Sequence, residues 1–131
     1  MLHPNQFSVN EAWIVFRLNE SPVCTEENGN FNVVCLMDSA SCYILGTELF
    51  SVEARSVPRT IAAKLIKAAA AQSGVQARQM YISDALPADD TAPLLEEIGM
   101  VISIIPDEQL WPFISEAREG FLKHVGGGRV Q

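Results

Sequence analysis

The chain has 131 residues and a formal net charge of −7, a length that suits one domain with one hydrophobic core. Its hydrophobic fraction of 48% and charged fraction of 19% are those of a globular protein, which excludes a disordered chain. The acidic balance argues against a general nucleic-acid binder, because such proteins present a basic face.

The first half of the sequence predicts an antiparallel meander. Three runs rich in β-branched and aromatic residues are typical of strands: 12–19, 31–37 and 42–50. Pro22 and the pair Asn28-Gly29 mark a long turn between the first two strands. A polar corner that begins with Asp38 joins the second strand to the third.

The second half alternates helices and strands: a helix over 58–74, a strand over 77–84, a helix over 89–99, a strand over 100–106 and a helix over 107–125. Pro58 suits the first helical turn and Gly74 the helix end. Asp90 or Thr91 is expected to cap the second helix. The continuous apolar run 100–106 is typical of a strand buried on both faces.

Helical spacing predicts a buried face on the first helix, through Ile61, Leu65, Ala68 or Ala69, and Gln72. Pro112 belongs in a first turn, so the regular part of the last helix is expected to start near Trp111.

The order βββαβαβα predicts an α/β fold with a mixed five-stranded sheet flanked by helices. Two strands separated by a helix usually run parallel through a right-handed crossover, whereas the meander is antiparallel. We expect a single domain over 1–131, with its core at about 12–125 and a flexible tail at 126–131.

This order is that of the ribonuclease H-like fold, and the sequence resembles the catalytic core of retroviral-type integrases and transposases. Three segments carry the resemblance: the hairpin MDSASCYILG, the stretch YISDALPADDTAPLLEEIGM and the last helix. The resemblance implies three carboxylates around two divalent ions, roughly 3.5–4 Å apart. Magnesium or manganese would be the cofactor, because such ions take hard oxygen ligands.

The resemblance places the second carboxylate at Asp84 and the third at Glu119, 35 positions on, with Glu116 as its competitor one turn earlier on the same helix face. The first carboxylate is missing, because Phe16 and Arg17 stand where the family has an aspartate. Glu20 is the nearest acid at the correct end of that strand. The candidate acidic cluster is therefore Glu20, Asp84, Glu116 and Glu119.

Asp38 cannot replace the missing aspartate. It ends a strand antiparallel to the first, so it lies at the opposite end of the sheet from Asp84. Seven strand residues span roughly 23 Å at about 3.3 Å each, which is too far for a shared metal. We interpret Asp38 as a turn residue that bonds its own backbone.

Charge is segregated along the chain. Residues 84–97 carry five acids and no base, whereas five of the nine basic residues fall earlier: Arg55, Arg59, Lys64, Lys67 and Arg78. Either these are two solvated helix faces of opposite sign, or the basic helix docks on an acidic partner. Trp111, Phe113 and Phe121 either pack in the core or form an apolar contact surface.

Cys24, Cys35 and Cys42 are odd in number and lack CxxC spacing, which argues against a disulfide framework or a zinc site. The sequence shows neither a signal peptide nor a membrane-span pattern, so a cytoplasmic protein is expected.

Two main functional hypotheses follow. The first is a non-catalytic, integrase-core-like domain that associates with a protein partner or as a homodimer, without a cofactor. The alternative is a metal-dependent nuclease or polynucleotidyl transferase-like enzyme with a rearranged carboxylate site. A third possibility is a domain that acts only when joined to a DNA-binding partner.

Overall fold

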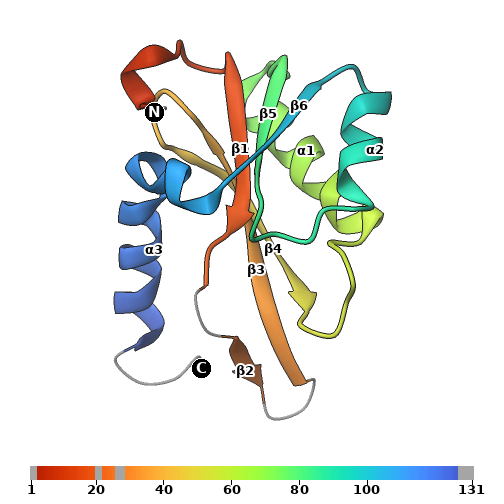
Figure 1. Cartoon of the computed structure of the whole chain (residues 1–131), viewed down its shortest axis with the longest axis vertical. Coiled ribbons are helices and arrows are strands. Elements are labelled where there is room, and N and C mark those ends of the chain that lie inside the picture. Colours follow the sequence, from red (N-terminus) through yellow and green to blue (C-terminus); the bar gives the residue numbers. More distant parts are fainter. Residues whose placement is uncertain (1–2, 20–21, 26–28, 127–131) are drawn as a thin grey trace.

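Six strands form one mixed sheet in the computed structural model, which describes residues 3–19, 22–25 and 29–126 (Figure 1). The strands are β1 (Ala12–Arg17), β2 (Val23–Thr25), β3 (Gly29–Asp38), β4 (Ile44–Ser51), β5 (Gln79–Ser83) and β6 (Val101–Ile105). The α-helices are α1 (Arg59–Ser73), α2 (Thr91–Glu97) and α3 (Trp111–Gly126), with short 3-10 helices η1 (Pro4–Gln6) and η2 (Asp107–Leu110).

The sheet order places β4 and β6 at its two outer sides. β3 pairs antiparallel with β1 on one side and with β4 on the other, while β1, β5 and β6 run parallel. This mixed sheet confirms the predicted fold class. The sixth strand, β2, is an addition: residues 23–25 pair with residues 29–31 inside the predicted long turn. A three-residue strand is too short to be recognised beside Pro22 and the asparagine-glycine pair.

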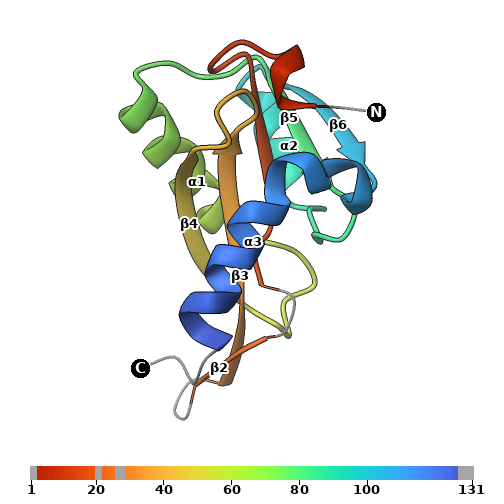
Figure 2. The same ribbon diagram turned by 90° about the vertical axis from the view of Figure 1, so that its left-hand side faces the viewer.

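The sheet separates two cores. Along β1, Trp13 and Val15 pack towards α1 and α2, whereas Ile14 and Phe16 pack towards α3. This is the alternation that a strand buried on both faces must show. Figure 1 shows α3 on one side of the sheet with α1 and α2 on the other, and Figure 2 gives the view from the α3 side.

Helix α1 lies close to the sheet through small residues. Its buried positions are Ala62, Leu65, Ile66 and Ala69. Gln72, predicted on this face, is instead exposed and donates to the Tyr43 hydroxyl at 3.1 Å. A Cβ added at Gly46 of β4 would stand 3.4 Å from the Leu65 side chain, so the glycine accommodates the close approach of α1.

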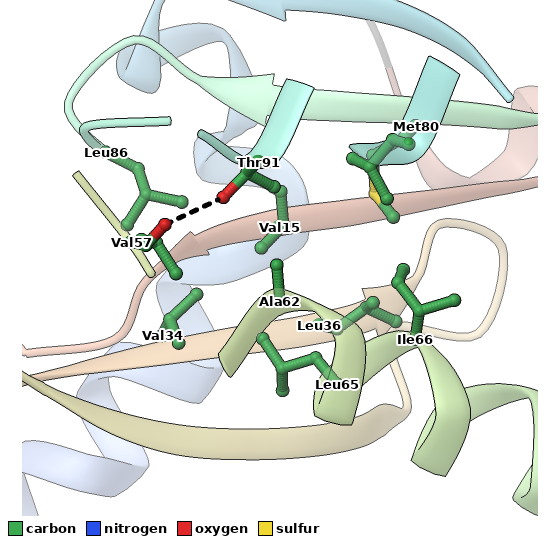
Figure 3. Close-up of a pocket in the computed structure, with 11 residues that line it drawn as sticks. Val15, Val34, Leu36, Val57, Ala62, Leu65, Ile66, Met80, Leu86 and Thr91 are labelled. Carbon is green, nitrogen blue, oxygen red and sulfur yellow. Dashed lines mark hydrogen bonds between the residues drawn. The ribbon is translucent and has the colours of Figure 1, made fainter. Parts of the chain in front are cut away.

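The core under α1 is closely packed and apolar, as Figure 3 shows. Its central hollow has a volume of only about 10 Å³. Thr91 turns its hydroxyl towards the carbonyl of Val57 at 3.4 Å. Asp90 does precede α2 but makes no side-chain cap, so the predicted capping bond is absent. This region is core and offers no room for a ligand.

Strand β6 corrects a prediction. The apolar run was expected to be buried on both faces, yet Val101 and Ile104 are 60% and 64% exposed. The reason is topological, because β6 pairs with β5 on one side and no described strand covers its other side. An apolar run indicates that a segment forms a strand, but it does not indicate whether the strand lies at the centre or at the edge of the sheet.

The last helix begins as predicted. The 3-10 helix η2 leads into α3 at Trp111, with Pro112 in the first turn. The aromatic trio divides: Phe113 is buried and Phe121 half-buried in the α3-side core, whereas Trp111 is exposed. Gly126, predicted to open the tail, closes α3, and residues 127–131 lie outside the described residues. None of the described helices has the length and hydropathy to span a membrane.

Candidate functional site

The candidate site lies where β1 and β5 end together. Because these strands are parallel and Val15 is level with Ile82, their carboxyl ends lie at the same edge of the sheet. Helix α3 packs over this edge on one face of the sheet (Figure 1). The resemblance to integrases locates their carboxylates in this region.

A buried phenyl ring occupies the place expected for the first carboxylate. Phe16 is fully buried on the α3 side of β1. The guanidinium carbon of Arg118 lies 5.6 Å from the centre of its ring, within the range of a cation–π contact. A phenyl ring offers no metal ligand, and a guanidinium repels a dication.

Arg118 joins three elements through hydrogen bonds. It donates to both carboxylate oxygens of Asp107, with Nη1–Oδ2 at 2.7 Å and Nη2–Oδ1 at 3.0 Å. Its Nε and Nη2 also donate to the carbonyl oxygen of Arg17, at 3.0 and 2.8 Å. The side chain therefore ties α3 to η2 and to the end of β1. Bidentate arginine–carboxylate geometry of this kind is among the stronger ionic contacts.

The electrostatic balance of this network favours an ionised Asp107. Burial by itself raises the pKa of Asp107, but hydrogen bonds from Arg118 and Ser83 and the charge of Arg118 together hold it below its ordinary value. The Ser83 hydroxyl donates to Oδ1 of Asp107. The charge of Asp107 is thus neutralised by Arg118.

Asp84 follows β5, as the resemblance predicts for the second carboxylate. Its Oδ1 accepts a hydrogen bond from the backbone amide of Asp107 at 2.9 Å. The side chain therefore fixes the start of η2, while the residue as a whole is exposed. In this position the carboxylate supports the loop that carries Asp107.

The two glutamates of α3 line different hollows. Glu119 lines a groove of about 500 Å³ together with Arg17, Asp107 and Arg118. Glu116 instead lines a hollow beside Cys42, and its charge helps raise the pKa of that thiol, after burial and the charge of Asp38. Of the two glutamates, only Glu119 therefore lines the groove that contains Asp107 and Arg118.

Glu20 lies outside the described residues. Among the residues that the structure describes, no three histidine, cysteine, aspartate or glutamate side chains are grouped as a metal site requires. The described donors at this edge do not fit a two-metal centre, because Phe16 is apolar and Asp107 is engaged by Arg118.

Asp38 is a turn residue, as predicted. It is buried, and its carboxylate accepts from the Asn10 amide at 2.7 Å and from the amide and hydroxyl of Ser41 at 2.9 and 2.7 Å. It pairs with Trp13 at the start of β1, at the opposite end of the sheet from Asp84. Asp38 therefore holds the β3–β4 corner and takes no part in the candidate site.

Sequence reasoning missed the Arg118–Asp107 pair. The two residues are eleven positions apart, across a 3-10 helix and a helix start, and no local spacing rule joins them. The only hint was a basic residue on the helix that should supply a carboxylate.

Comparison with known proteins supports the fold. The sequence matches no protein-family model and no curated protein. Among solved structures, a chain in the cryo-EM structure of the simian T-cell lymphotropic virus intasome in complex with the PP2A regulatory subunit B56 gamma is similar, with a TM-score of 0.53 and 13% identity. The match covers 95% of this chain and 43% of that chain. The architecture is consistent with a ribonuclease H-like integrase core. At this identity the likeness concerns the fold alone.

Proposed function

We propose that this chain is an integrase-core-like domain that acts in association with another protein rather than in nucleotidyl transfer. The observation that carries the proposal is the pair Phe16 and Arg118. A buried ring under a guanidinium stands at the position where the resemblance to metal-dependent integrase cores implies a carboxylate. A fold does not carry its function with it, so the residues at this edge weigh more than the likeness.

Exposed apolar side chains support a role in association. Trp111 and Leu122 on α3 are 55% and 57% exposed, and Val101 and Ile104 on β6 are exposed as well. Isolated apolar residues are common on protein surfaces, but tryptophan is enriched at interfaces. The net charge of −7 further favours a protein partner over nucleic acid.

The alternative is the metal-dependent enzyme built on Glu20, Asp84 and Glu119. Two observations favour this enzyme. Asp84 is exposed at the end of β5, and Glu119 lines the neighbouring groove. The third ligand would be Glu20.

A metal titration distinguishes the two functions. The melting temperature is recorded with increasing magnesium or manganese, for the wild type and for Asp84→Asn. A ligand at 100 times its dissociation constant stabilises a protein by about 2.7 kcal/mol, or several degrees for a domain of this size. We expect no shift in either protein. A shift in the wild type that Asp84→Asn abolishes would favour the enzyme.

A further inference from the structure

The backbone groups on the outer side of β6 pair with no strand in the part of the chain that the structure describes. The Val101 amide donates to the Arg78 carbonyl at 2.8 Å, and the Ile105 carbonyl accepts from the Asp84 amide at 2.9 Å. Residues 101, 103 and 105 therefore turn their backbone groups towards β5. Since successive residues alternate, Ile102 and Ile104 turn theirs outwards. No described strand pairs with that side.

A groove with acidic side chains adjoins this edge. It has a volume of about 460 Å³ and includes Ile104 together with Asp84, Asp89 and Glu96. The rest of its lining is mostly apolar: Ile82, Leu86, Pro87, Ala88, Ala92 and Pro93, with Ser83. Along the sheet, Ile82 and Asp84 share the face that carries α2, so the groove lies on the α2 side of β6.

The carboxylates of this groove are not neutralised within the described part of the chain. Glu97 of α2 pairs with Arg59 of α1, and Asp107 pairs with Arg118. Asp84, Asp89 and Glu96 form no ion pair with a described residue. One basic residue of α1, Arg59, is therefore paired with an acidic residue of the same chain. The carboxylates of the groove remain negatively charged.

We propose that β6 accepts an extended basic segment of a partner protein as an added strand. Main-chain hydrogen bonds to Ile102 and Ile104 would hold the segment, as in other cases of strand addition. Basic side chains at every second position would face Asp84, Asp89 and Glu96. Apolar side chains on the alternate positions would pack against Val101, which is exposed on the other face.

Electrostatics favours a basic segment of a partner protein over a second copy of this chain. Two copies would each bring a net charge of −7 to the contact, and like charges disfavour association. A basic strand gains the attraction that two copies would lack. This inference rests on the proposed role in protein association, and it specifies the surface and the chemistry of the partner.

The test uses a fluorescently labelled heptapeptide of alternating lysine and valine, with binding followed by anisotropy on the full chain. One control peptide carries N-methyl groups on alternate amides, which removes strand pairing and keeps the charge. A second control replaces lysine by glutamate. We expect each control to bind at least tenfold more weakly, and binding of the parent peptide to weaken as salt is raised.

Two matched variants locate the site. Ile104→Arg on β6 and Leu49→Arg on β4 both alter exposed side chains on outer strands, so both should fold, which circular dichroism checks. We expect Ile104→Arg to weaken binding at least tenfold and Leu49→Arg to leave it unchanged. Glu96→Lys should weaken binding without touching the backbone of β6.

Several results would overturn the proposal. They are absence of binding at millimolar peptide, equal binding of the N-methylated peptide, or wild-type binding by Ile104→Arg. A dimer in sedimentation that Ile104→Arg converts to a monomer would assign the edge to a second copy. The metal titration is run without peptide, so it is independent: a metal shift with intact peptide binding would overturn the non-catalytic role and leave the docking edge standing.

Discussion

Arg118 and Asp107 form a two-point ion pair that joins α3 to η2, and Arg118 also holds α3 against the carbonyl of Arg17 at the end of β1. The side chains of Arg118 and Asp107 are only 12% and 22% exposed, so the ion pair is largely shielded from water. The pair lies at the edge of the sheet where the resemblance to integrase cores implies carboxylates, and it contributes to the stability of the domain there.

Replacing Arg118 by methionine should destabilise the domain markedly. The change leaves the Asp107 carboxylate partly buried without its cation, which costs about 2–4 kcal/mol, slightly less than for a fully buried pair. Urea denaturation at pH 7 measures the change. Asp107→Asn in the same chain should recover part of the loss, because it removes the unpaired charge.

The exposed pair on the other side of the molecule provides the control. Arg59 and Glu97 are 51% and 58% exposed, and Arg59→Met should change the free energy of unfolding by about 0–1 kcal/mol. Equal effects of Arg118→Met and Arg59→Met would contradict the structural role of the Arg118–Asp107 pair.

The stability of the domain should fall in acid partly through Asp107. Its pKa is lower in the folded chain than in the unfolded chain, so its contribution is present above the unfolded value of about 3.9. That contribution is lost as the pH falls through the lower, folded value. Urea denaturation between pH 7 and pH 3 measures the dependence. Asp107→Asn should reduce its slope at the acidic end, and an unchanged slope would refute the assignment.

Removing the Asp38 carboxylate should weaken the β3–β4 corner. Asp38→Ala leaves the Asn10 amide and the Ser41 amide and hydroxyl without their acceptor. Fully buried groups left without partners cost about 1–3 kcal/mol, and because Asn10 is half-buried and Ser41 exposed, we expect a loss of about 1 kcal/mol. Asp38→Asn keeps one carbonyl acceptor and should cost less. Thermal or urea unfolding compares them, and a larger loss for Asp38→Asn would contradict this account.

Gly46 should tolerate a methyl group and reject a large side chain. A Cβ at this position would be 3.4 Å from the Leu65 side chain and 3.8 Å from Ala68, so Gly46→Ala should change stability by no more than about 1 kcal/mol. Gly46→Phe would push α1 away from β4, at a cost of about 1–3 kcal/mol. Equal melting temperatures for the two variants would show that α1 is not closely packed there.

The three thiols should react in a fixed order. Burial raises the pKa of Cys35 to about 12, and burial with the charges of Asp38 and Glu116 raises that of Cys42. Cys24 is exposed. At pH 8, alkylation followed by mass spectrometry should modify Cys24 first and Cys35 only on unfolding, because the thiolate is the reactive form. Early labelling of Cys35 in the folded protein would contradict its burial.

Local signals were sufficient for most of the fold. Pro58 and Gly74 bounded α1 within a residue, and Gly74 indeed takes a left-handed conformation with φ of 79°. The position of Asp38 at the end opposite Asp84 followed from strand direction alone. In each case the decisive information lay within a few residues or in a rule of connection.

The rest depended on contacts between distant segments. Val101 and Ile104 are exposed because β6 is the edge strand of the sheet. The apolar sequence of a strand does not show whether it will lie at an edge. Arg118 finds Asp107 only after η2 and α3 have packed against β1. A pattern of expected carboxylates likewise could not show that Glu116 and Glu119 line different hollows.

Strand β1 carries a polar anchor at each end: the Asp38 corner beside Trp13, and the Arg118 contact at the carbonyl of Arg17. Three apolar residues, Ile14, Val15 and Phe16, separate Trp13 from Arg17, and the span from Trp13 to Arg17 is roughly 13 Å at about 3.3 Å per residue. At such separations, the energetic effects of substitutions usually add. A substitution at the hairpin end and one at the Arg118 end should therefore lower the free energy of unfolding independently, and a double variant should lose the sum of the two.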